Sequence, residues 1–122
     1  MQKKYIGTGN YFEPNVQGKV VTMGNIQIDC AQRQSRETVI VDLCEDGQGN
    51  LVEGAVKGRA YIASLVIPAQ IVTERPQVEG GESVLDDQDN QLYEQAIAPL
   101  DMTTVSITLW PYISTTNNSQ EG

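Results

Sequence analysis

The clearest pattern in the chain is a strict alternation of apolar and polar residues within positions 101–113. Val105, Ile107 and Leu109 are separated there by hydroxyl side chains. A period of two places successive side chains on opposite faces of a β-strand, so one face is expected to be buried and the other wet. The same period recurs within residues 18–31 and 37–45, and a longer apolar run fills residues 59–73. The sequence therefore predicts four strand regions.

The regions 18–31 and 37–45 are joined by a short polar linker, which favours a hairpin between them. Matching their apolar faces pairs Ile26 with Leu43 and Cys30 with Val39. In that register Cys44, the second of the two cysteines, lies on the opposite face from Cys30. A disulfide is therefore not expected, because its geometry is strict, and both cysteines are predicted to be buried, reduced thiols.

Two further signals divide the chain. The segment Asp46-Gly47-Gln48-Gly49-Asn50 is rich in residues that tolerate a positive φ, and it predicts a reversal of the chain. Pro68 interrupts the apolar run of residues 59–73. Because proline cannot donate to a β-ladder, we expect Pro68 at an edge, at a bulge or at a break between two strands.

The region 76–100 has a different composition and is expected to be an acidic connector. Within it, residues 86–98 predict a short helix capped by Asp86 or Asp87, because apolar residues recur at i, i+4 spacing and Pro99 follows. Residues 114–122 are polar and predict a frayed C-terminal tail.

These elements predict a mostly β fold, either an antiparallel β-sandwich or a small β-barrel, with one short helix in the acidic connector. The length of 122 residues suits a single domain over residues 1–122. No apolar run reaches the roughly 18 residues of a membrane span. The N-terminus has two lysines but lacks the apolar segment of a signal peptide, so we expect a cytoplasmic protein or one incorporated into a virion.

The net charge of −8 is concentrated in the second part of the chain. All eight Lys and Arg residues lie between Lys3 and Arg75, whereas the part from Pro76 onward contains eight carboxylates and no basic residue. Binding of nucleic-acid phosphates or of an anionic membrane requires basic side chains. Direct nucleic-acid and membrane partners are therefore not expected, and protein partners are favoured.

The residue types that carry most enzyme chemistry are scarce. The chain has no histidine, which removes the commonest general base and the Ser-His-Asp arrangement. Gly7-Thr8-Gly9 lacks the third glycine of a phosphate-binding loop. We predict no catalytic, cofactor-binding or metal-binding residues and no enzyme activity, with a hydrolase that uses paired carboxylates as the alternative.

Two segments resemble the start of a calcium-binding loop, Asp46–Asn50 and Asp87–Gln91. Neither has the glycine and glutamate that complete an EF-hand. We therefore interpret the first segment as a hairpin turn and the second as the start of a helix. No cofactor is expected, and weak Ca²⁺ binding by clustered oxygens is the alternative.

The function that these features favour is a structural or assembly subunit of a larger homo-oligomeric particle, such as a capsid-associated or tail protein of a phage virion. The alternative is an acidic binding module, which inhibits a basic protein partner or holds a small ligand in a barrel. The interface is expected at aromatic and acidic side chains: Trp110, Tyr112, Asp86, Asp87 and Asp89.

Overall fold

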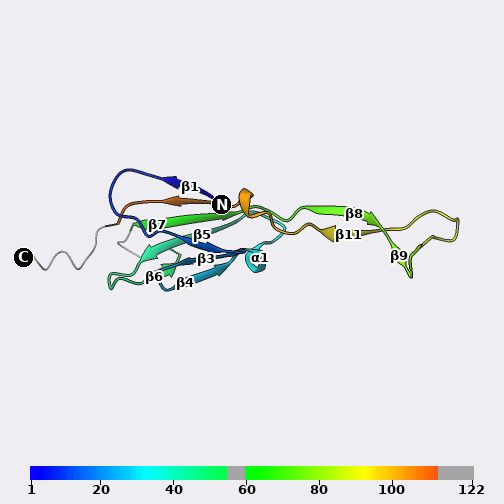
Figure 1. The fold of residues 1–122 in the computed structure, drawn as a ribbon, viewed down its shortest axis with the longest axis horizontal. Coiled ribbons are helices and arrows are strands. Elements are labelled where there is room, and N and C mark those ends of the chain that lie inside the picture. The colour runs from blue at the N-terminus through cyan, green and yellow to red at the C-terminus, as the bar shows by residue number, and fades with distance from the viewer. Residues whose placement is uncertain (55–59, 113–122) are drawn as a thin grey trace, which may run out of the picture.

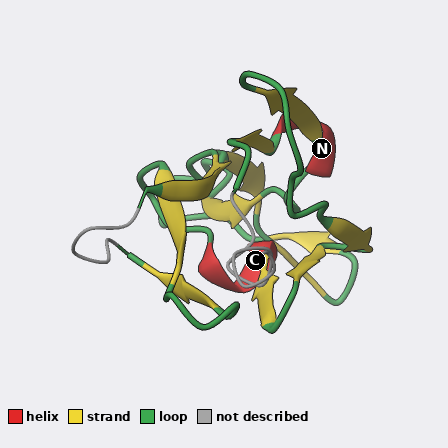
Figure 2. Cartoon of the chain, turned by 90° about the vertical axis from the view of Figure 1, so that its left-hand side faces the viewer, coloured by secondary structure: helices red, strands yellow, loops and turns green. Residues whose placement is uncertain are grey.

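The computed structural model describes residues 1–54 and 60–112, which form a β-rich body with a long hairpin projecting from it (Figure 1). A view along the long axis shows how little helix lies among the strands (Figure 2). Two sheets of the body pack against each other through one core. The predicted mostly β fold is therefore confirmed, and its arrangement is sandwich-like.

The larger sheet of the body has five strands. Their order is β1 (Gln2–Tyr5), β12 (Ser106–Leu109), β7 (Tyr61–Ile67), β5 (Val39–Glu45) and β6 (Leu51–Glu53). All neighbours are antiparallel except β1 and β12, which are parallel. The predicted alternation before and within β12 is confirmed, because Val105, Ile107 and Leu109 are buried and the residues between Val105 and Leu109 are only partly covered.

The smaller sheet has three antiparallel strands, β2 (Asn15–Gln17), β3 (Val20–Met23) and β4 (Ile26–Asp29). Here the predicted pairing is wrong, because β4 pairs with β3 and not with residues 39–43. Met23 faces Ile26 across a two-residue turn in which Gly24 has φ of 54°. That left-handed conformation suits glycine, so the chain reverses earlier than the apolar pattern alone suggests.

A short helix, α1 (Cys30–Arg33), follows β4 directly. Asp29 caps it, since the Asp29 Oδ1 atom accepts a hydrogen bond from the Gln32 backbone N–H at 3.2 Å. Cys30, predicted to lie in a strand, is thus the first residue of a helix. Both cysteines are buried and free, which confirms the prediction of reduced thiols.

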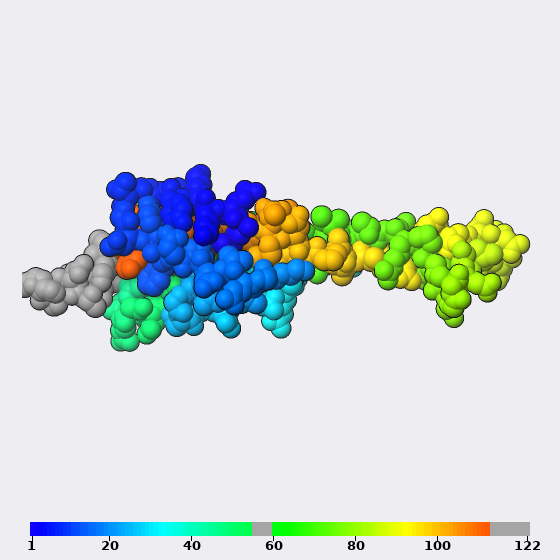
Figure 3. All heavy atoms as spheres, in the orientation of Figure 1, coloured from blue at the N-terminus to red at the C-terminus, as the bar shows by residue number. Residues whose placement is uncertain are grey.

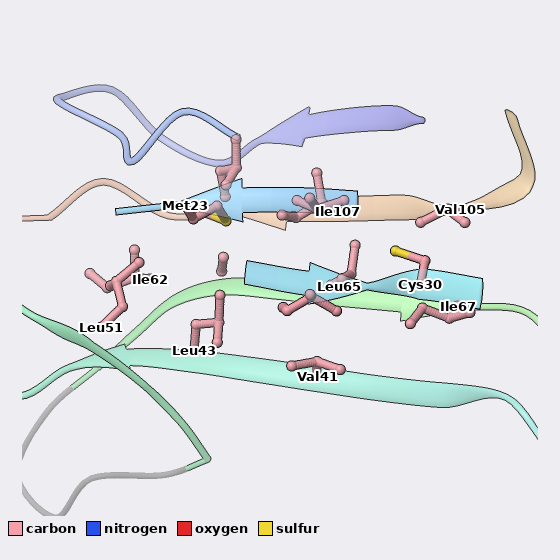
Figure 4. Close-up of a cluster of buried hydrophobic side chains, with 14 of the residues drawn as sticks. Met23, Cys30, Val41, Leu43, Leu51, Ile62, Leu65, Ile67, Val105 and Ile107 are labelled. Atoms are coloured by element: carbon pink, nitrogen blue, oxygen red, sulfur yellow. The ribbon is translucent and has the colours of Figure 1, made fainter. Parts of the chain in front are cut away.

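The core lies between the two sheets (Figure 4). Val21, Met23 and Ile28 from the smaller sheet meet the inward-facing residues of the larger one. The larger sheet and the segment just before β12 contribute Val41, Leu43, Leu51, Ala63, Leu65, Ile67, Val105, Ile107 and Leu109. Burial of these side chains is the main source of stability for the body.

A long hairpin leaves the body after β7, and we call its residues 71–98 the arm. It consists of β8 (Val72–Pro76) paired with β11 (Tyr93–Ile97), and of a smaller pair, β9 (Val78–Glu79) and β10 (Glu82–Ser83), toward its tip. A space-filling view shows the arm extending well beyond the body (Figure 3). Pro68 lies between β7 and β8, as expected for a break between two strands.

The predicted acidic connector of residues 76–100 falls largely within the arm, and the helix predicted there is wrong. Residues 86–98 form a loop and strand β11, and the one short α-helix of the described residues is α1 instead. Asp89 has φ of 63°, which a right-handed helix does not allow. Residues 72–76 also provide a pairing strand for 93–97, so cross-strand hydrogen bonds form in place of helical ones. A 3₁₀ turn, η1 (Met102–Thr104), leads into β12, and the predicted tail 114–122 lies outside the described residues.

Candidate interaction surface

Trp110 and Tyr112, two of the predicted interface residues, make contacts within the body. The ring centroid of Trp110 lies 6.5 Å from that of Tyr61, and the ring centroid of Tyr112 lies 4.5 Å from that of Phe12. The Tyr112 backbone N–H also donates to the carbonyl oxygen of Asn10 at 2.9 Å. Both side chains are only half-buried, so each keeps an exposed portion, and their role in an interface stays a prediction.

Asp86, Asp87 and Asp89 lie together in an exposed loop of the arm. Asp86 organises this loop, because its Oδ1 atom accepts hydrogen bonds from the backbone N–H groups of Asn90 at 2.9 Å and Gln88 at 2.8 Å. These bonds favour the charged carboxylate and lower the pKa of Asp86. Asp87 and Asp89 add two exposed carboxylates beside it. The loop therefore presents a concentrated negative charge.

The predicted aromatic interface residues and the predicted acidic interface residues do not lie close together in the structure. Segment 110–112 follows β12 at the end of the body that is opposite the arm, whereas loop 86–90 lies near the tip of the arm (Figure 1). The aromatic and the acidic residues therefore lie far apart on the molecule (Figure 1). The two sets belong to separate surfaces.

The two calcium-like segments both form turns. Asp46–Asn50 connects β5 to β6, as the predicted reversal requires, and the segment Asp87–Gln91 falls in a loop of the arm that is closed by Asp86 and Asn90. In each loop the aspartate Oδ1 atom already accepts two backbone N–H groups. Within residues 1–54 and 60–112 no group of three or more His, Cys, Asp or Glu side chains is placed to hold a metal ion.

The β8–β11 ribbon of the arm has two unlike faces. Cross-strand partners share a face, so Val72 lies beside Ile97, and Pro76 lies beside Tyr93. On this face the exposed fractions are 39% for Val72, 58% for Tyr93 and 55% for Ile97. The middle pair on this side, Glu74 and Gln95, is polar. We call this side, with its exposed Val72, Tyr93 and Ile97, the apolar face of the arm. Three large apolar side chains on one side of a ribbon are thus exposed, which makes this side a candidate interaction surface.

The opposite face of the ribbon is polar. It contains an ion pair in which the Arg75 Nε atom donates to the Glu94 Oε2 atom at 2.8 Å. Thr73 and Ala96 complete this face. Because its charged groups are paired with each other and its other side chains are small, the polar face is suited to solvent.

Gln91 holds the junction between the ribbon and the tip of the arm. Its side-chain Nε2 atom is within hydrogen-bonding distance of the carbonyl oxygens of Gln77 at 3.0 Å, Val84 at 3.2 Å and Leu92 at 2.7 Å. Three segments of the arm therefore meet at one amide. This role could not be predicted from the sequence, because glutamine is an ordinary residue at exposed positions.

The arm is strongly acidic. It has seven carboxylates and one guanidinium, that of Arg75, which gives it a net charge of −6. The preceding residues 1–70 contain seven acidic and seven basic residues and are neutral. A surface that binds the arm is therefore expected to be basic.

The two edges of the five-stranded sheet differ. At the β6 edge, the Asn25 side chain donates to the Leu51 carbonyl oxygen at 3.0 Å and accepts from the Leu51 N–H at 2.8 Å, so this edge is capped at Leu51. At the other edge, β1 pairs only with β12 among the described strands, and all four of its residues are exposed. Lys3 and Lys4 lie on β1. The open edge of the sheet is therefore also basic.

Cys30 belongs to the core. Burial raises the pKa of its thiol, the negative charge of Asp29 adds to this effect, and Arg33 opposes it. The neutral thiol is thus favoured, which suits a packing role. Arg33 itself is engaged with Glu53 of β6.

The described residues contain no helix that is long and apolar enough to cross a membrane. Comparisons of the chain with protein-family models, with curated proteins and with solved structures find no match, so the fold and the arm are the features from which a function is inferred.

Proposed function

We propose that this chain is a non-enzymatic structural subunit that self-associates into a larger particle, such as a phage virion in which it is a capsid-associated or tail protein. The observation that supports this is the exposure of the arm. No residue from 68 to 99 is buried. A two-stranded hairpin of this kind is at best marginally stable alone in water. A neighbouring chain that covers the arm would supply the buried area that the arm itself lacks.

The distribution of exposed apolar residues supports the same proposal. The described residues include eleven large apolar side chains that are exposed, and seven of them lie on the arm. These seven are Ile71, Val72, Val78, Leu85, Leu92, Tyr93 and Ile97. The body has buried its apolar residues efficiently, so the concentration on the arm indicates a contact surface.

The proposal is tested by measuring the mass of the full chain in solution as a function of concentration, by sedimentation or light scattering. We expect wild type to form oligomers. The triple variant Val72→Ser, Tyr93→Ser, Ile97→Ser should weaken self-association at least tenfold. The control variant Thr73→Ser, Ala96→Ser alters the polar face of the same ribbon and should assemble like wild type. A wild-type chain that stays monomeric at concentrations on the order of 100 µM would contradict the proposal.

The exposed loop that contains Asp86, Asp87 and Asp89 favours a second function, that of an acidic module that binds a basic protein. Its partner would recognise the exposed carboxylates of Asp87 and Asp89, and the contact would weaken steeply with salt. Polylysine serves as a probe for this function. Binding that is lost in Asp87→Asn, Asp89→Asn, together with a monomeric wild type, would favour this second function over self-assembly.

A further inference from the structure

We propose that strand β11 of one copy pairs edge to edge with strand β1 of a second copy, so that the arm extends the five-stranded sheet of its neighbour. This inference rests on the proposed self-assembly and names the two surfaces that meet. Addition of a strand to an open sheet edge is a general mode of protein recognition, in which backbone hydrogen bonds provide affinity.

The hydrogen-bond register of the arm indicates which edge is free to pair. The Gln77 N–H donates to the Leu92 carbonyl oxygen at 2.8 Å, and the Ala98 N–H donates to the Ile71 carbonyl oxygen at 2.9 Å. In an antiparallel ladder bonded and non-bonded pairs alternate. The backbone groups of Tyr93, Gln95 and Ile97 therefore point away from β8, and they form a row of donors and acceptors along the outer edge of β11.

The outer edge of β8 is less suited to pairing. Its outward residues are Val72, Glu74 and Pro76, the partners of the three outward residues on β11. Proline has no N–H group, so Pro76 interrupts the row of donors. Native proteins use edge prolines to prevent pairing between chains. Of the two edges of the ribbon, β11 is thus the one with a complete ladder.

Two arms are not expected to pair with each other. Each carries a net charge of −6, and its single cation, Arg75, is already engaged with Glu94. Like charges placed opposite each other on paired strands are destabilising. The partner surface should therefore be basic.

Strand β1 has the two properties that a partner of β11 needs, a free backbone edge and basic side chains. The Gln2 N–H and the Ile6 N–H donate to β12 and its flanking residue, each at 2.9 Å, so the backbone groups of Lys3 and Tyr5 face outward. Lys3 and Lys4 are adjacent and exposed, which complements the acidic arm. The opposite edge of this sheet, β6, has three residues and is capped at Leu51 by Asn25.

The edges of the smaller sheet are poorer acceptors. Strand β2 (Asn15–Gln17) has only three residues and no basic side chain, and β4 ends in Asp29. Pairing of β11 with β1 would place the arm after β1 in the order β6-β5-β7-β12-β1, giving seven strands shared by two copies. Each copy donates an arm and accepts another, which is a heterologous contact.

Two proline variants test which edge pairs. Gln95→Pro removes an outward N–H from β11, whereas Glu74→Pro removes the outward N–H of its direct cross-strand partner on β8. Both substitutions leave the bonded pairs of the hairpin in place. We expect Gln95→Pro to weaken self-association at least tenfold, and Glu74→Pro to assemble like wild type. Fluorescence of Trp110, the single tryptophan, checks that the body remains folded.

A mixing experiment tests whether the basic strand β1 is the edge that accepts the arm. The variant Lys3→Glu, Lys4→Glu has an intact arm but an acidic β1, and we expect it to be monomeric. Mixed with Gln95→Pro, which has an intact β1, it should form a dimer of one copy of each, because one intact arm meets one intact edge. Dimer formation is read from the mass of the mixture.

The outcomes separate this inference from the proposed function. If wild type assembles and Gln95→Pro assembles equally well, or if the two variants do not form a mixed dimer, pairing of β11 with β1 is wrong while self-assembly stands. If wild type is monomeric at concentrations on the order of 100 µM, both proposals fail.

Discussion

Asp46 and Asp86 hold two loops at opposite ends of the molecule in the same arrangement. In each loop the aspartate Oδ1 atom accepts from the backbone N–H groups two and four positions later, at distances of 2.7–3.2 Å. The fourth position has a left-handed backbone in both loops, with φ of 90° at Gly49 and 63° at Asp89. The loops share the pattern Asp-x-Gln-x-Asn. The side chain of the first aspartate, rather than glycine content, is therefore the common determinant.

Asp89 has a left-handed backbone in the loop of the arm, so substitution by glycine at this position should increase stability. Asp89→Gly removes the steric cost of a side chain at φ of 63°, and we expect a gain of up to about 1 kcal/mol in the local opening of the loop. Amide hydrogen exchange at Asn90, whose N–H binds Asp86, should slow by up to about fivefold. Gly49→Asp is the matched change in the other loop and should accelerate exchange at Asn50. Faster exchange in Asp89→Gly would contradict this reading.

The loop of the body predicts a pH dependence. Hydrogen bonds from the Gln48 and Asn50 backbone N–H groups lower the pKa of Asp46 below that of the unfolded chain. The charged carboxylate therefore stabilises the fold above the unfolded value of about 4, and this contribution is lost as the pH falls through the lower, folded pKa.

Asp46→Asn lacks this titration. Wild type should exceed it in free energy of unfolding at pH 7, and the difference should shrink below about pH 4. Urea unfolding followed by tryptophan fluorescence at several pH values measures the difference. A difference that stays constant from pH 7 to pH 3 is inconsistent with the proposed cause.

Truncation of apolar residues should separate the body from the arm. Leu65 is fully buried, so Leu65→Ala is expected to lower the free energy of unfolding by about 2–5 kcal/mol. Ile97 is 55% exposed, so Ile97→Ala should change that free energy by less than about 0.5 kcal/mol under conditions where the chain is monomeric. The same Ile97→Ala change should weaken self-association. Equal destabilisation by the two changes would mean that the apolar face of the arm is already packed within one molecule.

The cap on β6 predicts a change in solubility. Asn25→Ala removes both hydrogen bonds to the Leu51 backbone and should lower the free energy of unfolding by about 1–3 kcal/mol. It also opens the second edge of the larger sheet, so aggregation should increase. Light scattering during storage measures this. Gln27→Ala, on the exposed face of β4, is the control and should remain as soluble as wild type.

Much of the fold was predictable from local alternation. The buried positions 105, 107 and 109 follow from the sequence, as do the turn at Asp46–Asn50 and the break at Pro68. Strand pairing was less accessible, because alternation shows which face is buried but not which strand lies alongside. The two-residue turn at Gly24 pairs β4 with β3. The apolar pattern of β4 fits the pattern of residues 37–45 equally well, so alternation alone could not identify its partner.

The arm was the least predictable element. Val72, Tyr93 and Ile97 are apolar, and such residues are ordinarily expected in a core. The i, i+4 spacing in residues 86–98 suggested a helix, although positions 93, 95 and 97 fit a strand as well. Asp86, Asp87 and Asp89 were predicted as interface residues, and their position in one exposed loop is compatible with that role. Lys3, Lys4 and Gln91 carried no distinctive signal.

The parallel pairing of β1 with β12 has a consequence for synthesis. Gln2 faces Ser106, so the edge formed by β1 is attached to the sheet only after residues 106–109 have left the ribosome. The arm, residues 71–98, emerges earlier. Under the proposed contact, the donating strand would be available in a nascent chain before its own accepting edge exists. Neighbouring nascent chains on one messenger would then lack completed acceptors, which would protect them from premature polymerisation during translation.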